Sequence, residues 1–422
     1  MRFTLGAFCA ALLFSLSSFA ADSFALKSGD RVVFYGDSIT DQRLYTVIAE
    51  TYVATRFPDL DVRFVHSGWG GDKVSGGGGG PIDVRLSRDV LAYKPTVMTI
   101  MLGMNDGLYR AETEATDEAF FNGYKHIVET VKSALPAIRI TAIQPSPYDD
   151  VTRPPLFAGG YNEVLISFSK WIGNYAEKTG LNVADLNTPV VAMLRRANEL
   201  DPVEAQTIIK DRVHPGFAGH LIMAEALLKS WHARPLVSSV SLSAGSSPKL
   251  QAAEHATVTG LSAENGLSWT ETEDALPLPF AQWQQNWGVG PIPLVLRSSD
   301  VSQALNDEAL KVTGLKSGVY TLTVDGEKVA TFNNDELARG VNLALFESPM
   351  TKQAKEVYDL TVSHCDVHND RWRTVQVPLA AYNFPAASPA TQSADILEDA
   401  ILQKRREAAK PRPHKFDLAP LS

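Results

Sequence analysis

Short apolar runs alternate with amphipathic segments through the first half of the chain. Runs with the continuous apolar character of strands buried on both faces are Val32–Tyr35, Val62–Val65, Val97–Leu102, Ile138–Ile143 and Val183–Leu186. Between them, segments such as 119–135 and 161–178 repeat apolar residues with the period of a helix. This alternation predicts an α/β domain, in which a parallel sheet is covered by helices on both faces and a helix over 216–231 comes last.

The composition and the hydrophobic pattern of the sequence change after Arg234-Pro235. The residues that follow are rich in Ser, Thr and Gly and contain short runs of alternating apolar and polar residues. The whole chain has 422 residues, a length that favours two domains. We therefore predict one domain over 21–235 and an α+β accessory region over 236–422.

The accessory region carries signals for one hairpin and two helices. The alternating runs 319–324 and 328–332 flank an Asp-Gly turn, which is typical of a hairpin. A Ser-Pro pair at the start of 348–369 provides a cap and a first-turn proline, and so predicts a helix. A charged helix over 394–410 is expected next, followed by a Pro-rich tail that we expect to be loose.

A serine stands where the first apolar run ends. Ser38 follows Gly36-Asp37 and precedes a predicted helix. The carboxyl ends of parallel strands open into the ligand crevice, and a helix N-terminus favours an oxygen that gains negative charge. Asp and Ser are also the usual N-cap residues, so Gly-Asp-Ser alone is more often a simple helix cap.

Three further segments favour a chemical role for this serine. They are, in chain order, His-Ser-Gly-Trp-Gly-Gly-Asp at 66–72, Leu-Gly-Met-Asn-Asp at 102–106 and Asp-Arg-Val-His-Pro at 211–215. Acyl transfer by a serine requires a base, a carboxylate that orients the base, and donors for the developing oxyanion. The four segments together contain all of these groups.

Each group has a candidate residue. His214 can accept the proton of Ser38, and Asp211, three residues earlier, can reach the far nitrogen of the imidazole. The backbone N–H groups of Ser38 and Gly71 and the side-chain amide of Asn105 can form the oxyanion hole.

With these four blocks in this order, residues 28–233 resemble the SGNH hydrolases, the esterase superfamily that includes the GDSL lipases and acylhydrolases. The resemblance implies a three-layer α/β/α, flavodoxin-like fold and a catalytic domain over 21–235. It also implies the roles of nucleophile for Ser38, oxyanion donors for Gly71 and Asn105, and remaining triad members for Asp211 and His214, with no metal or cofactor. The chain departs from the pattern in having Ile39 after the serine and a His-Ser pair at the start of the second block. The second departure leaves Gly68 and Gly70 as alternative donors, and Gly71 is favoured because a Gly-Asp pair usually ends that block.

The N-terminus predicts export. Arg2 precedes the apolar stretch 3–16, and Ser18-Phe19-Ala20 satisfies the small-x-small rule for a signal peptidase. Residues 1–20 are therefore expected to be a signal peptide, and the mature protein to be secreted or periplasmic, without a stable membrane anchor.

Charge and side-chain clusters narrow the classes of ligand. The formal net charge is -9, and -10 without Arg2, which argues against binding nucleic acid or an anionic membrane surface through charge alone. His364 and His368 have the i, i+4 spacing of zinc ligands, but a polar helix face is the commoner explanation.

The tryptophans leave more than one interpretation open. Trp69 could line the acyl pocket or could simply pack. Four tryptophans of the accessory region could stack on sugar rings or belong to its core, namely Trp269, Trp283, Trp287 and Trp372. A third interpretation is that 340–344 and the helix behind it pack over the catalytic face.

We therefore expect an exported serine esterase that removes short acyl groups, such as acetyl, from a polysaccharide. Its partner is then an acylated carbohydrate substrate, and its oligomeric state is not determined by the sequence. One alternative is a lipid or aryl ester hydrolase. Another is a non-catalytic glycan-binding protein on a hydrolase scaffold, against which the intact Ser38, Asp211 and His214 argue.

Overall fold

The computed structural model describes residues 23–263, 266–285, 290–382 and 384–421. The predicted signal peptide and Trp287 lie outside the described residues. A five-stranded, entirely parallel sheet forms the centre of the first part of the chain, in the order β2-β1-β5-β6-β7. Its strands are β1 (Arg31–Gly36), β2 (Arg63–Gly68), β5 (Val97–Met101), β6 (Arg139–Gln144) and β7 (Asn182–Asp185). The parallel sheet predicted from the apolar runs is therefore confirmed.

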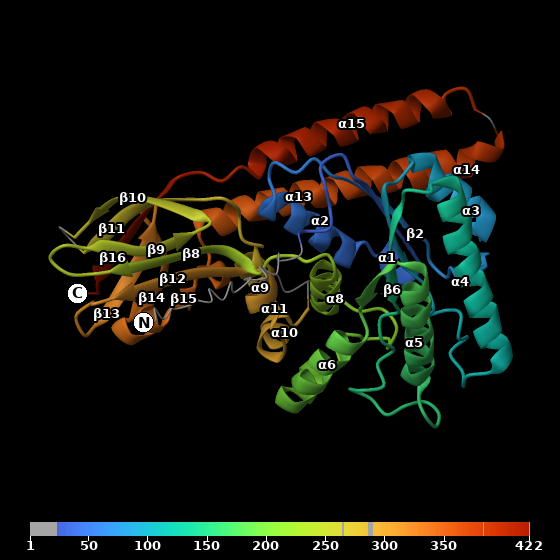
Figure 1. The fold of residues 1–422 in the computed structure, drawn as a ribbon, viewed down its shortest axis with the longest axis horizontal. Helices are drawn as coiled ribbons and strands as arrows, with labels where there is room; N and C mark the ends of the chain where they lie inside the picture. The colour runs from blue at the N-terminus through green and yellow to red at the C-terminus, as the bar shows by residue number, and fades with distance from the viewer. Residues whose placement is uncertain (1–22, 264–265, 286–289, 383, 422) are drawn as a thin grey trace, which may run out of the picture.

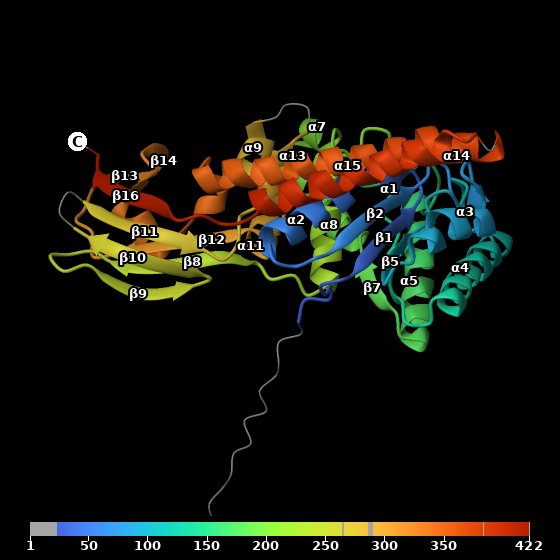
Figure 2. The same cartoon turned by 90° about the horizontal axis from the view of Figure 1, so that it is seen from above.

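Helices cover both faces of this sheet, as Figures 1 and 2 show. Helices α2 (Leu44–Arg56) and α8 (Phe217–Ser230) pack against each other on one face, while α4 (Glu114–Ala134) and α5 (Tyr161–Thr179) lie on the other. Helix α4 begins earlier than the predicted residue 119, because Thr113 forms a capping box that stabilises an additional first turn. The three-layer α/β/α architecture is the expected one.

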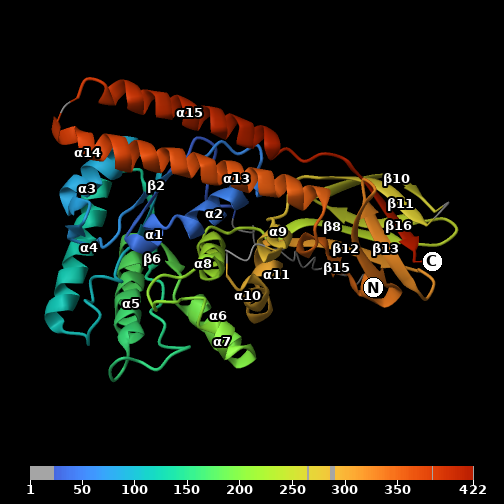
Figure 3. The same cartoon turned by 180° about the vertical axis from the view of Figure 1, so that it is seen from behind.

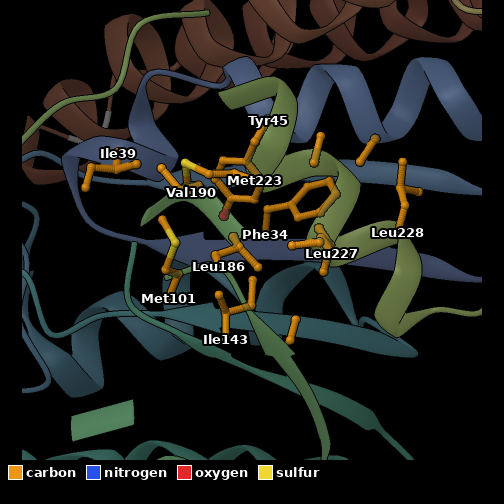
Figure 4. Close-up of a cluster of buried hydrophobic side chains, with 14 of the residues drawn as sticks. Phe34, Ile39, Tyr45, Met101, Ile143, Leu186, Val190, Met223, Leu227 and Leu228 are labelled. Atoms are coloured by element: carbon orange, nitrogen blue, oxygen red, sulfur yellow. The ribbon is translucent and has the colours of Figure 1, made fainter. Parts of the chain in front are cut away.

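The core of this part fills both faces of the sheet, and one of its two layers lies between the sheet and helix α8. Figure 4 shows Phe34 of β1 and Ile143 of β6 directed toward Met223 and Leu227 of α8. All four side chains are buried. Helix α8 is buried over nearly its whole length, and such a helix gains most of its stability from packing. It directly follows the segment that contains His214, so the core fixes the position of that segment at the start of the helix.

The accessory region has two sheets, one with strand order β10-β11-β16-β13-β14 and one with strand order β15-β12-β8-β9. Their strands are β8 (Leu236–Ser243), β9 (Lys249–Glu254), β10 (Ala256–Ser262), β11 (Leu267–Glu273), β12 (Asp307–Thr313), β13 (Val319–Val324), β14 (Glu327–Asn333), β15 (Val341–Asn342) and β16 (His414–Pro420). Strands β13 and β14 form the predicted hairpin. The α+β prediction for this region is confirmed.

The prediction of a loose C-terminal tail is wrong. Strand β16 pairs with β11 on one side and with β13 on the other, so it lies in the middle of its sheet. Phe416 and Leu418 alternate with polar residues and are buried. The run is short and has prolines beside it, and these prolines argued against a strand, because proline is normally confined to strand ends and edges.

A helical hairpin from the accessory region runs along the α/β part, as Figures 1 and 3 show. Its helices are α13 (Pro349–Asn369), which begins with the predicted Ser-Pro cap, and α15 (Ala387–Ala408), which begins before the predicted residue 394. Helix α13 contacts α2 and β2. Side chains of residues 278–285 and 290–305 also pack into the core of the α/β part.

The expectation for segment 340–344 is only half right. Val341-Asn342 form strand β15, and Leu343 packs in the core of the accessory region, so this segment does not cover the catalytic face. The helix that follows it, α13, does pack against the α/β part. Hydrogen bonding to β12 holds the segment in its own sheet.

Candidate active site

The residue predicted to be the nucleophile begins a short helix at the carboxyl end of β1. Helix α1 spans Ser38–Asp41, and the Asp37 side chain caps it by accepting a hydrogen bond from the Ile39 N–H at 3.0 Å. Burial raises the pKa of Asp37 to about 7. The cap is therefore supplied by Asp37, which leaves the hydroxyl of Ser38 available for another contact.

Ser38, His214 and Asp211 form a continuous line of contacts. The Nε2 atom of His214 lies 2.8 Å from Ser38 Oγ, and its Nδ1 lies 2.7 Å from Asp211 Oδ2. These distances are those of hydrogen bonds in a nucleophile, base and orienting acid. The structure thus brings together three residues that are up to 176 positions apart in the chain.

The backbone turn of this segment holds Asp211 in place. Asp211 Oδ1 accepts hydrogen bonds from the N–H groups of Val213, at 3.0 Å, and His214, at 2.8 Å. Partial burial acts to raise the pKa of Asp211, but the hydrogen bonds from His214 and Val213 outweigh it, and the pKa is lowered overall. Asp211 is therefore a carboxylate at neutral pH, and it favours the tautomer in which His214 Nδ1 carries the proton.

Two of the three predicted oxyanion donors, Gly71 and Asn105, lie in loops that are tied together. Asn105 Nδ2 donates to the backbone oxygen of Asp72 at 3.0 Å, which ties the loop after β5 to the residue that follows Gly71. An amide nitrogen carries two hydrogens, so a second donor remains on Asn105. Gly71 has φ of 77°, a conformation that favours glycine, and no heavy atom lies within 4 Å of the position of a Cβ. The Gly71 backbone therefore borders open space.

Two polar residues near the site have structural partners of their own. Asp106 Oδ1 accepts from the Val74 N–H at 2.9 Å, so this side chain orients the loop, and burial raises its pKa to about 7. His220 lies in α8, where its Nδ1 accepts from the Tyr45 N–H at 3.2 Å. This buried histidine is thus a helix residue bound to α2.

Tyr109 is a site residue that the sequence did not reveal. Its hydroxyl donates to Asn105 Oδ1 at 2.9 Å. Both Leu108 and Tyr109 have positive φ, 57° and 54°, which is costly for bulky side chains and is concentrated at functional sites. No sequence pattern predicts this turn, because glycine or asparagine ordinarily occupies positions with positive φ.

A buried arginine supports the loop that contains Gly71. Arg85 donates from Nε to Asp72 Oδ2 and from one Nη to the Ser67 backbone oxygen, each at 2.7 Å, and also pairs with Asp89. The Arg85 side chain is fully buried. A buried charge that is fully paired with its neighbours fixes their geometry, so this network defines the shape of the loop.

The three accessory-region tryptophans that the structure describes do not offer a surface for sugar stacking. Trp269, Trp283 and Trp372 are each exposed by 2% or less, so they pack in the interior. Trp69 lies edge-on to Trp372, at 5.3 Å between ring centres. The interpretation of these side chains as core is therefore the right one for the three that the structure describes.

His364 and His368 both face the carboxylate of Glu398, at 3.7 and 3.6 Å. Within the described ranges, no group of three or more His, Cys, Asp or Glu side chains is arranged to hold a metal ion. Among the same residues, no helix is both long enough and apolar enough to cross a bilayer.

Comparisons with known proteins agree with this architecture. A sequence model of the GDSL-like Lipase/Acylhydrolase family matches residues 34–222. An acetylxylan esterase of Geobacillus stearothermophilus is 25% identical over 222 residues, which are 48% of this chain and 94% of that protein. A solved structure of a gut microbial diltiazem-metabolizing enzyme is 25% identical, with a TM-score of 0.81, and the match covers 94% of this chain and 98% of that chain.

The parallel sheet, with polar loops along one edge, and the family match together place this domain in the SGNH superfamily of hydrolases. Residues 34–222 belong to the GDSL-like lipase/acylhydrolase family, which is a family of ester hydrolases. The structural match to the diltiazem-metabolizing enzyme extends well beyond this domain, because it covers nearly the whole chain and so includes most of the accessory region.

Proposed function

We propose that this protein is an exported serine esterase that hydrolyses short acyl esters of carbohydrates through an acyl-enzyme. The observation that carries the proposal is the line of contacts from Ser38 Oγ through His214 to Asp211, at 2.8 and 2.7 Å. The similarity to an acetylxylan esterase supports the substrate class. The expected signal peptide supports export.

The chemistry follows from the geometry. Ser38 Oγ attacks the ester carbonyl carbon while His214 Nε2 takes its proton, and the negative oxygen binds to the N–H groups of Ser38 and Gly71 and to Asn105. Collapse of this intermediate breaks the bond to the alcohol, which leaves with the proton from His214. Water then attacks the acyl-enzyme by the same route, and releases the acid and free Ser38.

The openness of the site suits a bulky alcohol portion. The side chains of His214 and Asp211 are 36% and 56% exposed, so the triad lies at the surface rather than at the end of a tunnel. A long acyl chain gains its affinity by burial of its methylene groups, which a surface site cannot provide. A short acyl group on a large alcohol is therefore favoured over a lipid.

A small-molecule ester, in place of a polysaccharide ester, is the second candidate substrate. It is favoured by the match to a diltiazem-metabolizing enzyme over nearly the whole chain, whereas the acetylxylan esterase matches about half. Under this alternative the accessory region would serve a small-molecule esterase rather than a polysaccharide esterase.

One panel of substrates separates these possibilities. We would compare purified protein with its Ser38→Ala variant on p-nitrophenyl acetate, butyrate and octanoate, on acetylated xylan and on diltiazem. Faster release from acetylated xylan than from the small esters supports the proposal, and the reverse order supports the second candidate. Equal rates for both proteins on every substrate would exclude a serine esterase.

A further inference from the structure

The turn of the helical hairpin reaches the edge of the sheet where Ser38 lies. Helix α13 continues into the segment Asp370–Gln376, which winds as a π-helix and which we call the connecting segment. Wide π turns are uncommon and occur frequently at functional sites. Its Trp372 is buried and donates from Nε1 to Asp89 Oδ1 at 2.7 Å, so the connecting segment is anchored to the α/β part.

Arg373 of the connecting segment contacts both sides of the candidate active site. One Nη atom donates to Asp41 Oδ1 at 3.3 Å and to the backbone oxygen of Gly68 at 3.4 Å. Its guanidinium carbon lies 3.6 Å from the centre of the Trp69 ring, within the range of a cation–π contact. Asp41 ends the helix that Ser38 begins, whereas Gly68 and Trp69 lead into the loop that contains Gly71.

Asp41 extends this contact to the loop backbone. Its Oδ2 accepts a hydrogen bond from the Gly70 N–H at 3.2 Å, so Arg373, Asp41 and Gly70 form a chain of contacts that ends beside Gly71. The loop and the helix approach closely here, because a Cβ on Gly68 would lie 2.2 Å from the backbone nitrogen of Asp41. A small shift of the loop would therefore displace the Gly71 N–H relative to Ser38.

We propose that Arg373 is a positioning residue for the esterase reaction, and that it holds the Gly68–Gly71 loop against the helix of Ser38. The inference rests on the proposed function, because it assigns to the loop the oxyanion donor of that reaction. It also gives the accessory region a part in catalysis. Arg373 lies outside residues 34–222, so the family domain alone lacks this support.

The test uses the full chain with a matched pair of substitutions. Arg373→Met removes the charge and the hydrogen bonds but keeps most of the length of the side chain. Arg371→Met makes the same change two residues earlier, where the arginine pairs with Asp395 of α15 and with Gln376. Each variant is assayed on p-nitrophenyl acetate, and amide hydrogen exchange is followed in a peptide that covers residues 66–72.

We expect Arg373→Met to lower kcat about tenfold to a hundredfold with little change in KM, because a misplaced oxyanion donor acts on the transition state. Exchange in residues 66–72 should become faster in that variant only. Arg373→Lys, which keeps the charge, should recover part of kcat. Arg371→Met should match the wild type in both measurements.

Two results would overturn the inference. One is an Arg373→Met variant that keeps wild-type kcat on a substrate that the wild type hydrolyses and Ser38→Ala does not. The other is an amide exchange rate of residues 66–72 that does not distinguish the two variants. This would be the case if both Arg373→Met and Arg371→Met kept the wild-type rate, or if both raised it equally. If the wild type hydrolyses nothing in the panel, the proposed function fails, and the exchange measurement still decides whether Arg373 positions the loop.

Discussion

At the scale of single residues, the structure assigns different partners to side chains that look alike in the sequence. Asp37, Asp106 and Asp211 all stand beside candidate catalytic residues. Only Asp211 contacts the imidazole of His214, whereas Asp37 caps a helix and Asp106 holds the Val74 N–H. The environment, rather than the residue type, therefore separates the orienting acid from the two structural carboxylates.

Ser38→Ala is expected to remove esterase activity by several orders of magnitude, because in the proposed mechanism the hydroxyl forms the acyl-enzyme. His214→Ala should be about equally damaging, since the two residues act as a unit. Steady-state kinetics and a fluorophosphonate label check both. Labelling at a serine other than Ser38 would contradict the assignment.

The pH dependence follows from the state of Asp211 and His214. The pKa of Asp211 is lowered, because its hydrogen bonds to His214 and Val213 outweigh partial burial, so Asp211 remains a carboxylate through the neutral range. A protonated His214 cannot accept the proton of Ser38, so kcat/KM should be lower in acid than at neutral pH. A rate that does not depend on pH would exclude His214 as the base.

Asn105→Ala should lower kcat by roughly 10²–10³ with a smaller effect on KM, because an oxyanion donor acts on the charged intermediate. Tyr109→Phe, which removes the hydrogen bond to Asn105 Oδ1, should lower kcat by only about threefold to tenfold, the range for one neutral hydrogen bond. A thermal melt is the control. An Asn105→Ala variant that melts earlier but keeps kcat would make Asn105 a loop residue only.

At the scale of elements, the last strand has the largest effect on the architecture. Strand β16 completes the sheet between β11 and β13, and Phe416 stacks on Trp269 with ring centres 5.1 Å apart. The hydrogen bonds of β11 and β13 on these sides would be lost without it. The C-terminal strand is therefore expected to be required for the fold of the accessory region.

Phe416→Ala should lower the free energy of unfolding by about 3–5 kcal/mol, because it removes a buried aromatic ring from a packed core. Lys415→Ala is the matched control on the opposite face, where the side chain is 66% exposed, and should change stability by less than about 0.5 kcal/mol. Urea unfolding of the full chain measures both. Equal midpoints for the two variants would contradict a packed central position for β16.

At the scale of the whole molecule, a buried acidic cluster lies where the two parts meet. Glu271, Glu273 and Glu308 are buried in the accessory region. The two parts are joined nearby by Arg56 of α2, which donates a hydrogen bond to the backbone oxygen of Leu305 at 2.9 Å. Burial and mutual repulsion raise the pKa of Glu273 to about 8, and burial raises that of Glu271 to about 7. Burial and repulsion from Glu273 also raise the pKa of Glu308.

This cluster should make the protein less stable as the pH rises. Because these carboxyl groups bind protons more tightly in the folded state, their contribution is fully present below the unfolded pKa, about 4.5, and is lost as the pH rises through about 8. The free energy of unfolding, measured in urea at about pH 5 and pH 8, should fall across this range, and Glu308→Gln should reduce the difference. An unchanged difference in Glu308→Gln would show that Glu308 does not contribute.

The sequence by itself determined the features whose signals are local. Continuous apolar runs predicted the parallel strands, and three of the four short blocks follow such runs, so the carboxyl ends of the strands bring those three blocks to one edge. The roles of Ser38, Gly71, Asn105, Asp211 and His214 came from the resemblance of the four blocks to the SGNH hydrolases. Only the tertiary structure decided the place of β16, the contact of Tyr109 with Asn105 and that of Arg373 with the loop. These depend on strand pairing, on a turn with unusual backbone angles and on residues more than 300 positions apart, none of which leaves a periodic pattern in the chain.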